Sequence, residues 1–337
     1  MKMKHNVMIL VGLFATIIYG DALDDGRRAI RYGAEAKYIY RIVDDEGMPV
    51  MGADAHVWFS SYGRKWDNAD WIVKTDVHGS FTAAHRLNER FSVGVEKDGY
   101  YYSRDEIFYL GMMTLPVKDG KWQPYGENRT LVLKRIRNPK DLRPGEMKKL
   151  KRYHEYPAFD EWVGFDFVQG DWCSPYGRGV ESDVLLRFNR TDLENGFSRS
   201  MDVSFTNSPY AGAYVMDCDT FSHLKTTYLA DTNRTFQTSF HFTYEQRGKR
   251  LVNGEMNASQ YMVFRVRTKV DAEGRLVSAH YGRMLGDWRF CEGGGMGIGD
   301  TILNPTPNDP NLEDVEAVRR TRLFIRDSRR FSQKKNR

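Results

Sequence analysis

The stretch VDDEGMPVMGADAHVWF (residues 43–59) predicts a β-strand, a tight turn and a second β-strand. The turn falls at Asp45-Glu46-Gly47, where glycine can adopt a positive φ without steric strain. Pro49 then fixes φ just before the next strand. From Ala53 to Ser60, small or polar residues alternate with apolar ones, which is typical of a strand with one buried face. The stretch therefore predicts the start of a small β-sandwich.

The flanking sequence continues this pattern of short apolar runs separated by turn signals. One such signal is Asp98-Gly99, which suits a tight hairpin. We expect strands at Lys37–Val43, Ala53–Ser60, Trp71–Lys74, Ser80–Ala84, Phe91–Lys97, Tyr100–Tyr102 and Thr130–Ile136. About seven strands at this spacing predict a β-sandwich over residues 37–136.

Three segments of this region carry further motifs: IVDDEGMPVMGADAHVWF, KTDVHGSFTA and FSVGVEKDGYYYS. In order they read D-x-x-G-x-P-V-x-G-A, then T-D-x-x-G-x-F, then K-x-G-Y, which resembles the carboxypeptidase regulatory-like, or transthyretin-like, β-sandwich family. The matching residues are Asp44, Gly47, Pro49, Val50, Gly52, Ala53, Val57, Thr75, Asp76, Gly79, Phe81, Lys97, Gly99 and Tyr100. The resemblance covers under a third of the chain and implies a structural or interaction module rather than a catalytic one.

The rest of the chain divides into three further parts. Residues 137–157 are basic and contain three prolines, so we expect a linker there. Residues 158–310 are rich in β-branched and aromatic runs, which predict a second, mostly antiparallel β domain, either a sandwich or a curved sheet, of no family that we recognise. Residues 311–337 predict a short helix near Leu312–Phe324 followed by a basic tail. The predicted fold class is therefore mainly β.

The N-terminus has the pattern of an export signal. Lys2 and Lys4 precede an apolar run at Val7–Tyr19, and small residues follow at Gly20-Asp21-Ala22. The run is shorter than the roughly 20 residues that a transmembrane helix needs. We expect a signal peptide at residues 1–22 and a secreted or periplasmic protein that is soluble after cleavage. Retention of the segment as an anchor is the open alternative.

The formal net charge of +5 is concentrated at the C-terminus. The segment Arg319–Arg337 contains nine basic residues against Asp327, so this segment carries +8 and the remaining chain −3. We therefore expect no nucleic-acid-binding fold. The basic tail could attract an anionic envelope polymer or lipid surface, and solvated disorder is an equally open reading.

The three cysteines, Cys173, Cys218 and Cys291, all lie in the second half of the chain. Two of them, Cys173 and Cys291, are the last residues of the related segments VQGDWC (168–173) and MLGDWRFC (284–291). Pairing of these segments would join Cys173 to Cys291 in a disulfide, whereas two similar edge turns would leave them unpaired. Neither CxxC nor zinc-type Cys/His spacing occurs, so we expect no metal and no cofactor.

A catalytic hypothesis depends on carboxylates that lie near tryptophans in residues 158–310. The candidates are Asp166, Asp171, Glu181 and Asp287, with Asp183 in the same region. A β-sandwich glycosidase places two carboxylates roughly 5–5.5 Å or 6.5–9.5 Å apart. The motif E-x-D-x-E is absent, so a secreted polysaccharide hydrolase is the alternative reading rather than the first.

A binding hypothesis depends on aromatic residues around the polar loop SSYGRKWDNADW (60–71). Trp58 and Trp71 can belong to the sandwich core, which leaves Tyr62 and Trp66 as the exposed candidates. Exposed aromatic rings stack on sugars or anchor protein interfaces. We therefore expect an exported, non-enzymatic envelope or extracellular protein with a binding, adhesion or scaffold role. A glycan or an envelope protein would be its partner.

Overall fold

The computed structural model describes most of the chain after the N-terminal segment. The described residues are 25–63, 68–109, 116–142, 153–206, 209–248, 250–253, 259–286, 289–291, 295–297 and 300–335. The expected signal peptide at 1–22 lies outside them. Within these residues, no helix combines the length and the apolar character needed to cross a bilayer.

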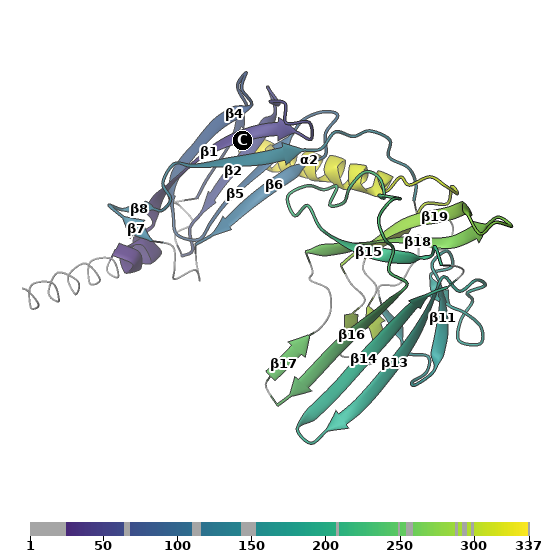
Figure 1. Ribbon diagram of the computed structural model, residues 1–337. Helices are drawn as coiled ribbons and strands as arrows, with labels where there is room; N and C mark the ends of the chain where they lie inside the picture. The colour runs from purple at the N-terminus through teal and green to yellow at the C-terminus, as the bar shows by residue number, and fades with distance from the viewer. Residues whose placement is uncertain are drawn as a thin grey trace, which may run out of the picture. The chain divides into compact units, whose positions relative to one another are not determined.

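The protein is mainly β and divides into two compact units (Figure 1). Unit 1 comprises residues 1–136, 221–223 and 321–337, and unit 2 comprises residues 137–220 and 224–320. Each unit has its own sheets and its own buried core. The mainly β fold class with antiparallel sheets is therefore confirmed.

Unit 1 contains two sheets. One has the strand order β4-β1-β8-β7, with β9 added beside β1, and the other has the order β3-β2-β5-β6. Their bounds are β1 (Ala34–Asp44), β2 (Asp54–Ser60), β3 (Ala69–Lys74), β4 (Ser80–Leu87), β5 (Arg90–Glu96), β6 (Ser103–Phe108), β7 (Val117–Lys118), β8 (Lys121–Trp122) and β9 (Glu127–Leu133). Strand β1 pairs antiparallel with β4 and parallel with β9.

Alternation along the strands explains why these two sheets form a sandwich. Alternate residues of β1 and β2 are buried, so each strand presents one apolar face to a common core. In that core, Phe91 packs against Tyr38, Tyr40 and Phe59, with ring centroids 4.6, 6.1 and 4.8 Å away. Tyr40 comes from one sheet, whereas Phe59 and Phe91 come from the other. One core therefore joins the two sheets.

The turn of the opening stretch is held by Asp44. Its carboxylate accepts hydrogen bonds from the backbone N–H groups of Glu46 and Met48 at 3.0 and 2.9 Å and pairs with Arg135 at 2.5 Å. Gly79, with φ of 72°, lies against the end of β1, where an added Cβ would stand 2.3 Å from the carbonyl oxygen of Ile42. Glycine is therefore required there by both conformation and space.

Unit 2 contains three sheets. The orders are β12-β11-β13-β14-β16-β17, β15-β18-β19-β22 and β10-β21-β20. Their bounds are β10 (Tyr153–Glu155), β11 (Trp162–Asp166), β12 (Asp171–Trp172), β13 (Val184–Leu193), β14 (Gly196–Phe205), β15 (Gly212–Asp217), β16 (Ser239–Arg247), β17 (Arg250–Asn253), β18 (Gln260–Val270), β19 (Leu276–Leu285), β20 (Arg289–Cys291), β21 (Gly295–Gly297) and β22 (Asp300–Leu303). The two larger sheets share one core, in which Phe167 stacks on Phe264 at 4.7 Å.

The structure differs from the expected linker at 137–157. Residues 137–142 belong to unit 2, where the backbone N–H groups of Arg137 and Asn138 donate to the carboxylate of Glu313 at 2.8 and 2.6 Å. Residues 153–155 form β10, which pairs with β21. Residues 143–152 lie outside the described part. Backbone bonds to the Glu313 carboxylate therefore tie the start of this segment to unit 2.

The C-terminal helix is also longer than expected. Helix α2 (Val315–Lys335) continues well beyond Phe324 and includes most of the segment expected to be a tail. Ala317, Val318 and Thr321 are buried at helical spacing, and neither glycine nor proline interrupts the helix. The basic residues are therefore compatible with helix because arginine and lysine are themselves good helix formers.

Candidate functional site

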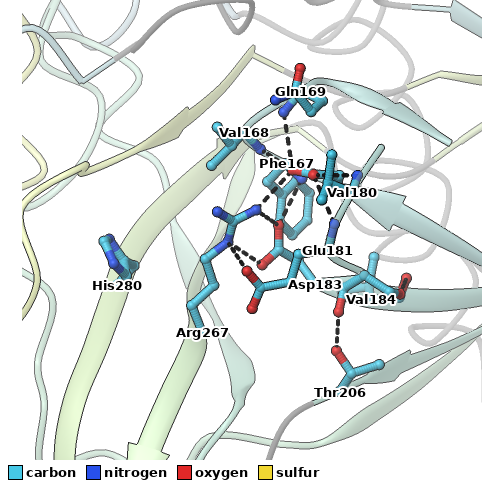
Figure 2. A network of polar contacts seen from close by, with 12 residues as sticks. Phe167, Val168, Gln169, Val180, Glu181, Asp183, Val184, Thr206, Arg267 and His280 are labelled. Atoms are coloured by element: carbon cyan, nitrogen blue, oxygen red, sulfur yellow. Dashed lines mark hydrogen bonds and ion pairs between the residues drawn. The ribbon is translucent and has the colours of Figure 1, made fainter. Parts of the chain in front are cut away.

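Three of the candidate carboxylates gather around Arg267 in unit 2 (Figure 2). Asp166 ends β11, Asp183 lies just before β13, and Glu181 lies between them in the sequence. Arg267 reaches them from β18, a strand of the other large sheet. Its nearest carboxylate oxygens are 2.8 Å away on Asp166, 3.0 Å on Asp183 and 3.8 Å on Glu181.

An irregularity in β18 coincides with this arginine. The pairing of β18 with β19 shifts register between Val266 and Lys269, and Arg267 has φ of 52°. A bulge of this kind re-aims a side chain relative to its strand neighbours. A left-handed conformation costs a non-glycine residue about 1–2 kcal/mol. The ion pairs with Asp166 and Asp183 therefore have to compensate for a strained backbone.

The carboxylate of Asp166 is surrounded by hydrogen-bond donors. Backbone N–H groups of Val168 and Gln169 donate to Oδ1, and those of Val180 and Glu181 donate to Oδ2, at distances of 2.8 to 3.1 Å. Burial by itself raises the pKa of Asp166, but these amides and Arg267 outweigh it, so the pKa lies below its usual value. Asp166 is therefore an ionised residue that orders the 166–181 turn region.

Asp183 shares the arginine but has a different environment. Its side chain is fully buried, and burial raises its pKa above the usual value despite the hydrogen bonds from Arg267 and the Phe167 amide. Oδ1 accepts from Arg267 Nε at 3.0 Å, and Oδ2 accepts from the Phe167 N–H at 2.8 Å. Arg267 Nη2 adds a further bond to Oδ2 at 3.2 Å. Both oxygens of Asp183 are thus engaged by the protein.

This geometry is that of a structural clamp. A carboxylate acting as nucleophile or general base must reach a substrate atom, yet all four oxygens of Asp166 and Asp183 already accept protein hydrogen bonds. Glu181 differs, because its side chain is 48% exposed and lies at the edge of the cluster. We call Asp166, Glu181, Asp183 and Arg267 the clamp. Its ion pairs connect the turn region between β11 and β13 to β18 of the other large sheet.

Asp171, another candidate carboxylate, lies apart from the ion pairs of Arg267. Asp171 lies opposite Asp166 in the β11–β12 pairing, and its carboxylate bonds to Arg178 at 3.3 Å. Burial raises the pKa of Asp171, but the Arg178 and Trp172 amides and the Arg178 side chain lower it below its usual value. Asp287 lies outside the described residues.

Neither Cys173 nor Cys218, the two cysteines whose side chains the structure describes, is an activated nucleophile. Cys173 and Cys218 are free thiols. Burial raises the pKa of the Cys173 thiol, and nearby Asp166 and Asp183 raise it further, which keeps it protonated. The sequence leaves a disulfide to Cys291 as one of two open readings; Cys173 is unbridged in the structure, and the side chain of Cys291 lies outside the described part. The pairing itself stays a prediction.

A second polar constellation crosses the outer face of the large β11-containing sheet. Trp162, Arg187, Asp202 and His241 lie directly opposite one another on β11, β13, β14 and β16. The Arg187 guanidinium lies 4.9 Å from the Trp162 ring and 2.9 Å from Asp202, and Asp202 accepts from His241 Nδ1 at 2.6 Å. Sequence reasoning missed this row, because only strand register aligns residues so far apart in the chain.

Unit 1 contains exposed aromatic residues, though not entirely where the sequence predicts them. Tyr62 is 67% exposed, as expected, whereas Trp66 lies outside the described residues. Trp71 packs on Phe59 at 5.5 Å, but Trp58 is 46% exposed. The alternation of β2 explains the difference, because Trp58 stands between the inward-facing Val57 and Phe59.

The outer face of the β3-β2-β5-β6 sheet gathers further apolar side chains around Trp58. Phe108 of β6 and Ile72 of β3 are each 46% exposed on this face. The Arg90 guanidinium of β5 contacts both aromatic rings, 5.1 Å from the centre of the Trp58 ring and 5.9 Å from that of the Phe108 ring. We call Trp58, Ile72, Arg90 and Phe108 the aromatic face. Strand alternation was the sequence signal that could have revealed it.

Metal ligation has no support in the described part of the chain, since no group of three or more His, Cys, Asp or Glu side chains there could hold an ion. The clamp contains two close carboxylates, but the Arg267 guanidinium occupies the position between them.

Comparisons with known proteins add little to this geometry. No family model matches the chain, and no curated protein matches it. Solved structures that resemble part of it include 3-chlorocatechol 1,2-dioxygenase from Rhodococcus opacus 1CP (13% identity, TM-score 0.25) and hydroxyquinol 1,2-dioxygenase from Pseudomonas putida DLL-E4 (16%, 0.24). Each match covers 31% of this chain, and 61% and 57% of the respective dioxygenase. The chain thus spans less than two thirds of these neighbours, and similarity at this level carries no argument about function.

Proposed function

We propose that this chain is an exported, non-enzymatic protein with a binding or scaffold role in the cell envelope or outside the cell. The observation that carries the proposal is that the oxygens of the buried candidate carboxylates are already hydrogen-bonded within the protein. All four carboxylate oxygens of Asp166 and Asp183 accept hydrogen bonds from Arg267 or from backbone amides. We infer that these carboxylates stabilise unit 2 and do not act on a substrate.

The aromatic face of unit 1 supports a binding role. Tryptophan and arginine are enriched among residues that dominate binding energy, and contiguous exposed apolar side chains mark interaction sites. Trp58 and Phe108 offer aromatic surface on either side of Arg90, whose guanidinium can donate hydrogen bonds. We infer that a glycan is the ligand, held by ring stacking and by hydrogen bonds from Arg90.

A glycan array and a polysaccharide hydrolysis screen on the same protein test this function. We expect glycan binding without bond cleavage. Trp58→Ala should weaken binding by at least tenfold, whereas Phe159→Ala, which truncates a similarly exposed aromatic residue in unit 2, should leave it unchanged. Equal loss in both variants would rule out the aromatic face, and binding of a protein but no glycan would change the ligand class.

The hydrolase alternative keeps one specific observation in its favour. The side chain of Glu181 is 48% exposed at the edge of the cluster, and a carboxylate that reaches solvent can act on a substrate. If the screen detects hydrolysis that Glu181→Gln abolishes without a change in thermal stability, the enzymatic reading replaces the binding one. Asp183→Asn is unsuitable as the first variant, because it also removes a partner of Arg267.

A further inference from the structure

The charge of the C-terminus acquires a defined geometry in helix α2 (Figure 1). An α-helix turns by about 100° per residue, so positions 319, 322, 326, 329, 330 and 334 fall within about 140° of arc. Each of these positions is an arginine or lysine. With a rise of about 1.5 Å per residue, the row is about 22 Å long. We call these six positions the basic side of α2.

In the first half of α2, several side chains away from the basic side are buried or packed against the protein. Ala317, Val318 and Thr321 are buried, and the Phe324 ring packs against Tyr102 of unit 1 at 4.3 Å. Arg319 and Arg322, in contrast, are exposed. Among the described side chains of α2, Val315 and Leu323 are 40% and 37% exposed, which is too few to form the broad apolar face of an interfacial amphipathic helix. The attraction expected from the basic side is therefore electrostatic.

We propose that the basic side of α2 binds the headgroups of an anionic phospholipid surface. Charge complementarity carries the proposal, since the C-terminal segment holds +8 while the rest of the chain holds −3. Such an asymmetry orients the molecule with α2 toward a negative surface. A phospholipid is chosen over a nucleic acid because the export signal expected at residues 1–22 would bring the chain to the cell envelope, where anionic lipid surfaces lie. The inference goes beyond glycan binding and is independent of the aromatic face.

The affinity expected from the basic side can be stated as a ratio. Each Lys or Arg close to an anionic surface increases the partition coefficient about fivefold. Three such residues together therefore contribute about a hundredfold. Because the interaction is screened within a Debye length of about 10 Å at 0.1 M salt, raising the ionic strength should remove most of it.

The test is co-sedimentation of the full chain with vesicles of phosphatidylcholine alone or with about one third phosphatidylglycerol. The readout is the ratio of the two partition coefficients, which cancels binding by the N-terminal apolar segment. We expect a ratio well above ten at 50 mM salt that falls toward one at 300 mM. In the variant R322Q/R326Q/R330Q the ratio should fall about a hundredfold, with a lower limit of one, at which the protein no longer prefers the anionic vesicles. Glutamine keeps the helix because its helix propensity is similar to that of arginine.

Two controls separate the location of the charge from its amount and from the fold. R190Q/R234Q/R275Q removes the same charge from exposed arginines of unit 2 and should change the ratio far less. R322K/R326K/R330K keeps the charge and should bind like the parent. A parent ratio near one at low salt overturns the proposal, as does equal loss in the unit 2 variant or loss in the lysine variant. Preference for a single-stranded oligonucleotide over the anionic vesicles overturns it too.

Discussion

Replacement of Arg267 by methionine should show how much the clamp stabilises unit 2. The change removes the cation from Asp183, which is fully buried, and from Asp166, whose side chain is 2% exposed. Asp166 retains four backbone donors, so most of the loss falls on Asp183, which keeps only the Phe167 N–H among its described bonds. Removing one partner of a buried ion pair costs about 3–5 kcal/mol. We expect Arg267→Met to lower the free energy of unfolding of unit 2 by this amount.

Urea denaturation with a double-mutant cycle measures this effect. Asp183→Asn removes the stranded charge, so Arg267→Met/Asp183→Asn should recover part of the loss and be more stable than Arg267→Met alone. The pH dependence has a defined sign. In Arg267→Met, the folded-state pKa of Asp183 should lie further above its unfolded value. The stability that protonated Asp183 contributes to the folded state is then fully present below the unfolded pKa and is lost as the pH rises through the folded pKa. The deficit should therefore be smaller at pH 4 than at pH 7.

Two results would refute this reasoning. If Arg267→Met changed the free energy of unfolding by less than about 1 kcal/mol, the pair would behave like an exposed surface ion pair. If Asp183→Asn failed to restore stability in the Arg267→Met background, the loss would come from packing at the β18 irregularity rather than from a stranded charge. Because the chain has two units, the transition of unit 2 must be followed separately from that of unit 1.

Three further predictions concern other parts of the molecule. Gly79→Ala should destabilise unit 1 by more than Gly99→Ala in a thermal denaturation comparison, because both have positive φ but only the Cβ at 79 meets a backbone oxygen at 2.3 Å; equal costs would show that conformation alone matters. The pKa of Asp202 is lowered, against the effect of burial, by hydrogen bonds from His241 and Arg187, so its stabilisation is present above the unfolded pKa and lost as the pH falls through the folded pKa. Asp202→Asn should therefore cost up to about 1 kcal/mol at pH 7 and progressively less as the pH falls through the folded pKa of Asp202, and a loss that did not shrink on acidification would contradict this. Thiol titration of the denatured protein without reductant should find one thiol if Cys173 and Cys291 pair, and three thiols would end the disulfide prediction.

Local patterns accounted well for the strands of unit 1. The predicted run Ala53–Ser60 corresponds to β2 at Asp54–Ser60, and Phe91–Lys97 corresponds to β5 at Arg90–Glu96. These predictions succeeded because alternation and turn residues are properties of neighbouring positions. The extent of α2 was harder to predict, since a run of arginines fits both a solvated tail and a helix whose opposite side is buried.

The candidate site was only partly visible in the sequence. The sequence singled out Asp166 and Glu181 as catalytic candidates, and the structure places both beside Arg267, which nothing in the sequence identified. Arg267 lies 101 positions from Asp166 and reaches it from another sheet through an irregular strand. Because these carboxylates are paired with a cation, we interpret them as structural rather than as reactive groups.

The sequence by itself determined that the chain is built from β-strands, where its turns fall and where its positive charge lies, because each depends on residues close together in the chain. The tertiary structure decided which carboxylates Arg267 binds, which aromatic residues reach the surface and which residues in the first half of α2 are buried. Those outcomes depend on strand register and on packing between sheets. Contacts of that kind join residues far apart in the chain, so no local pattern records them.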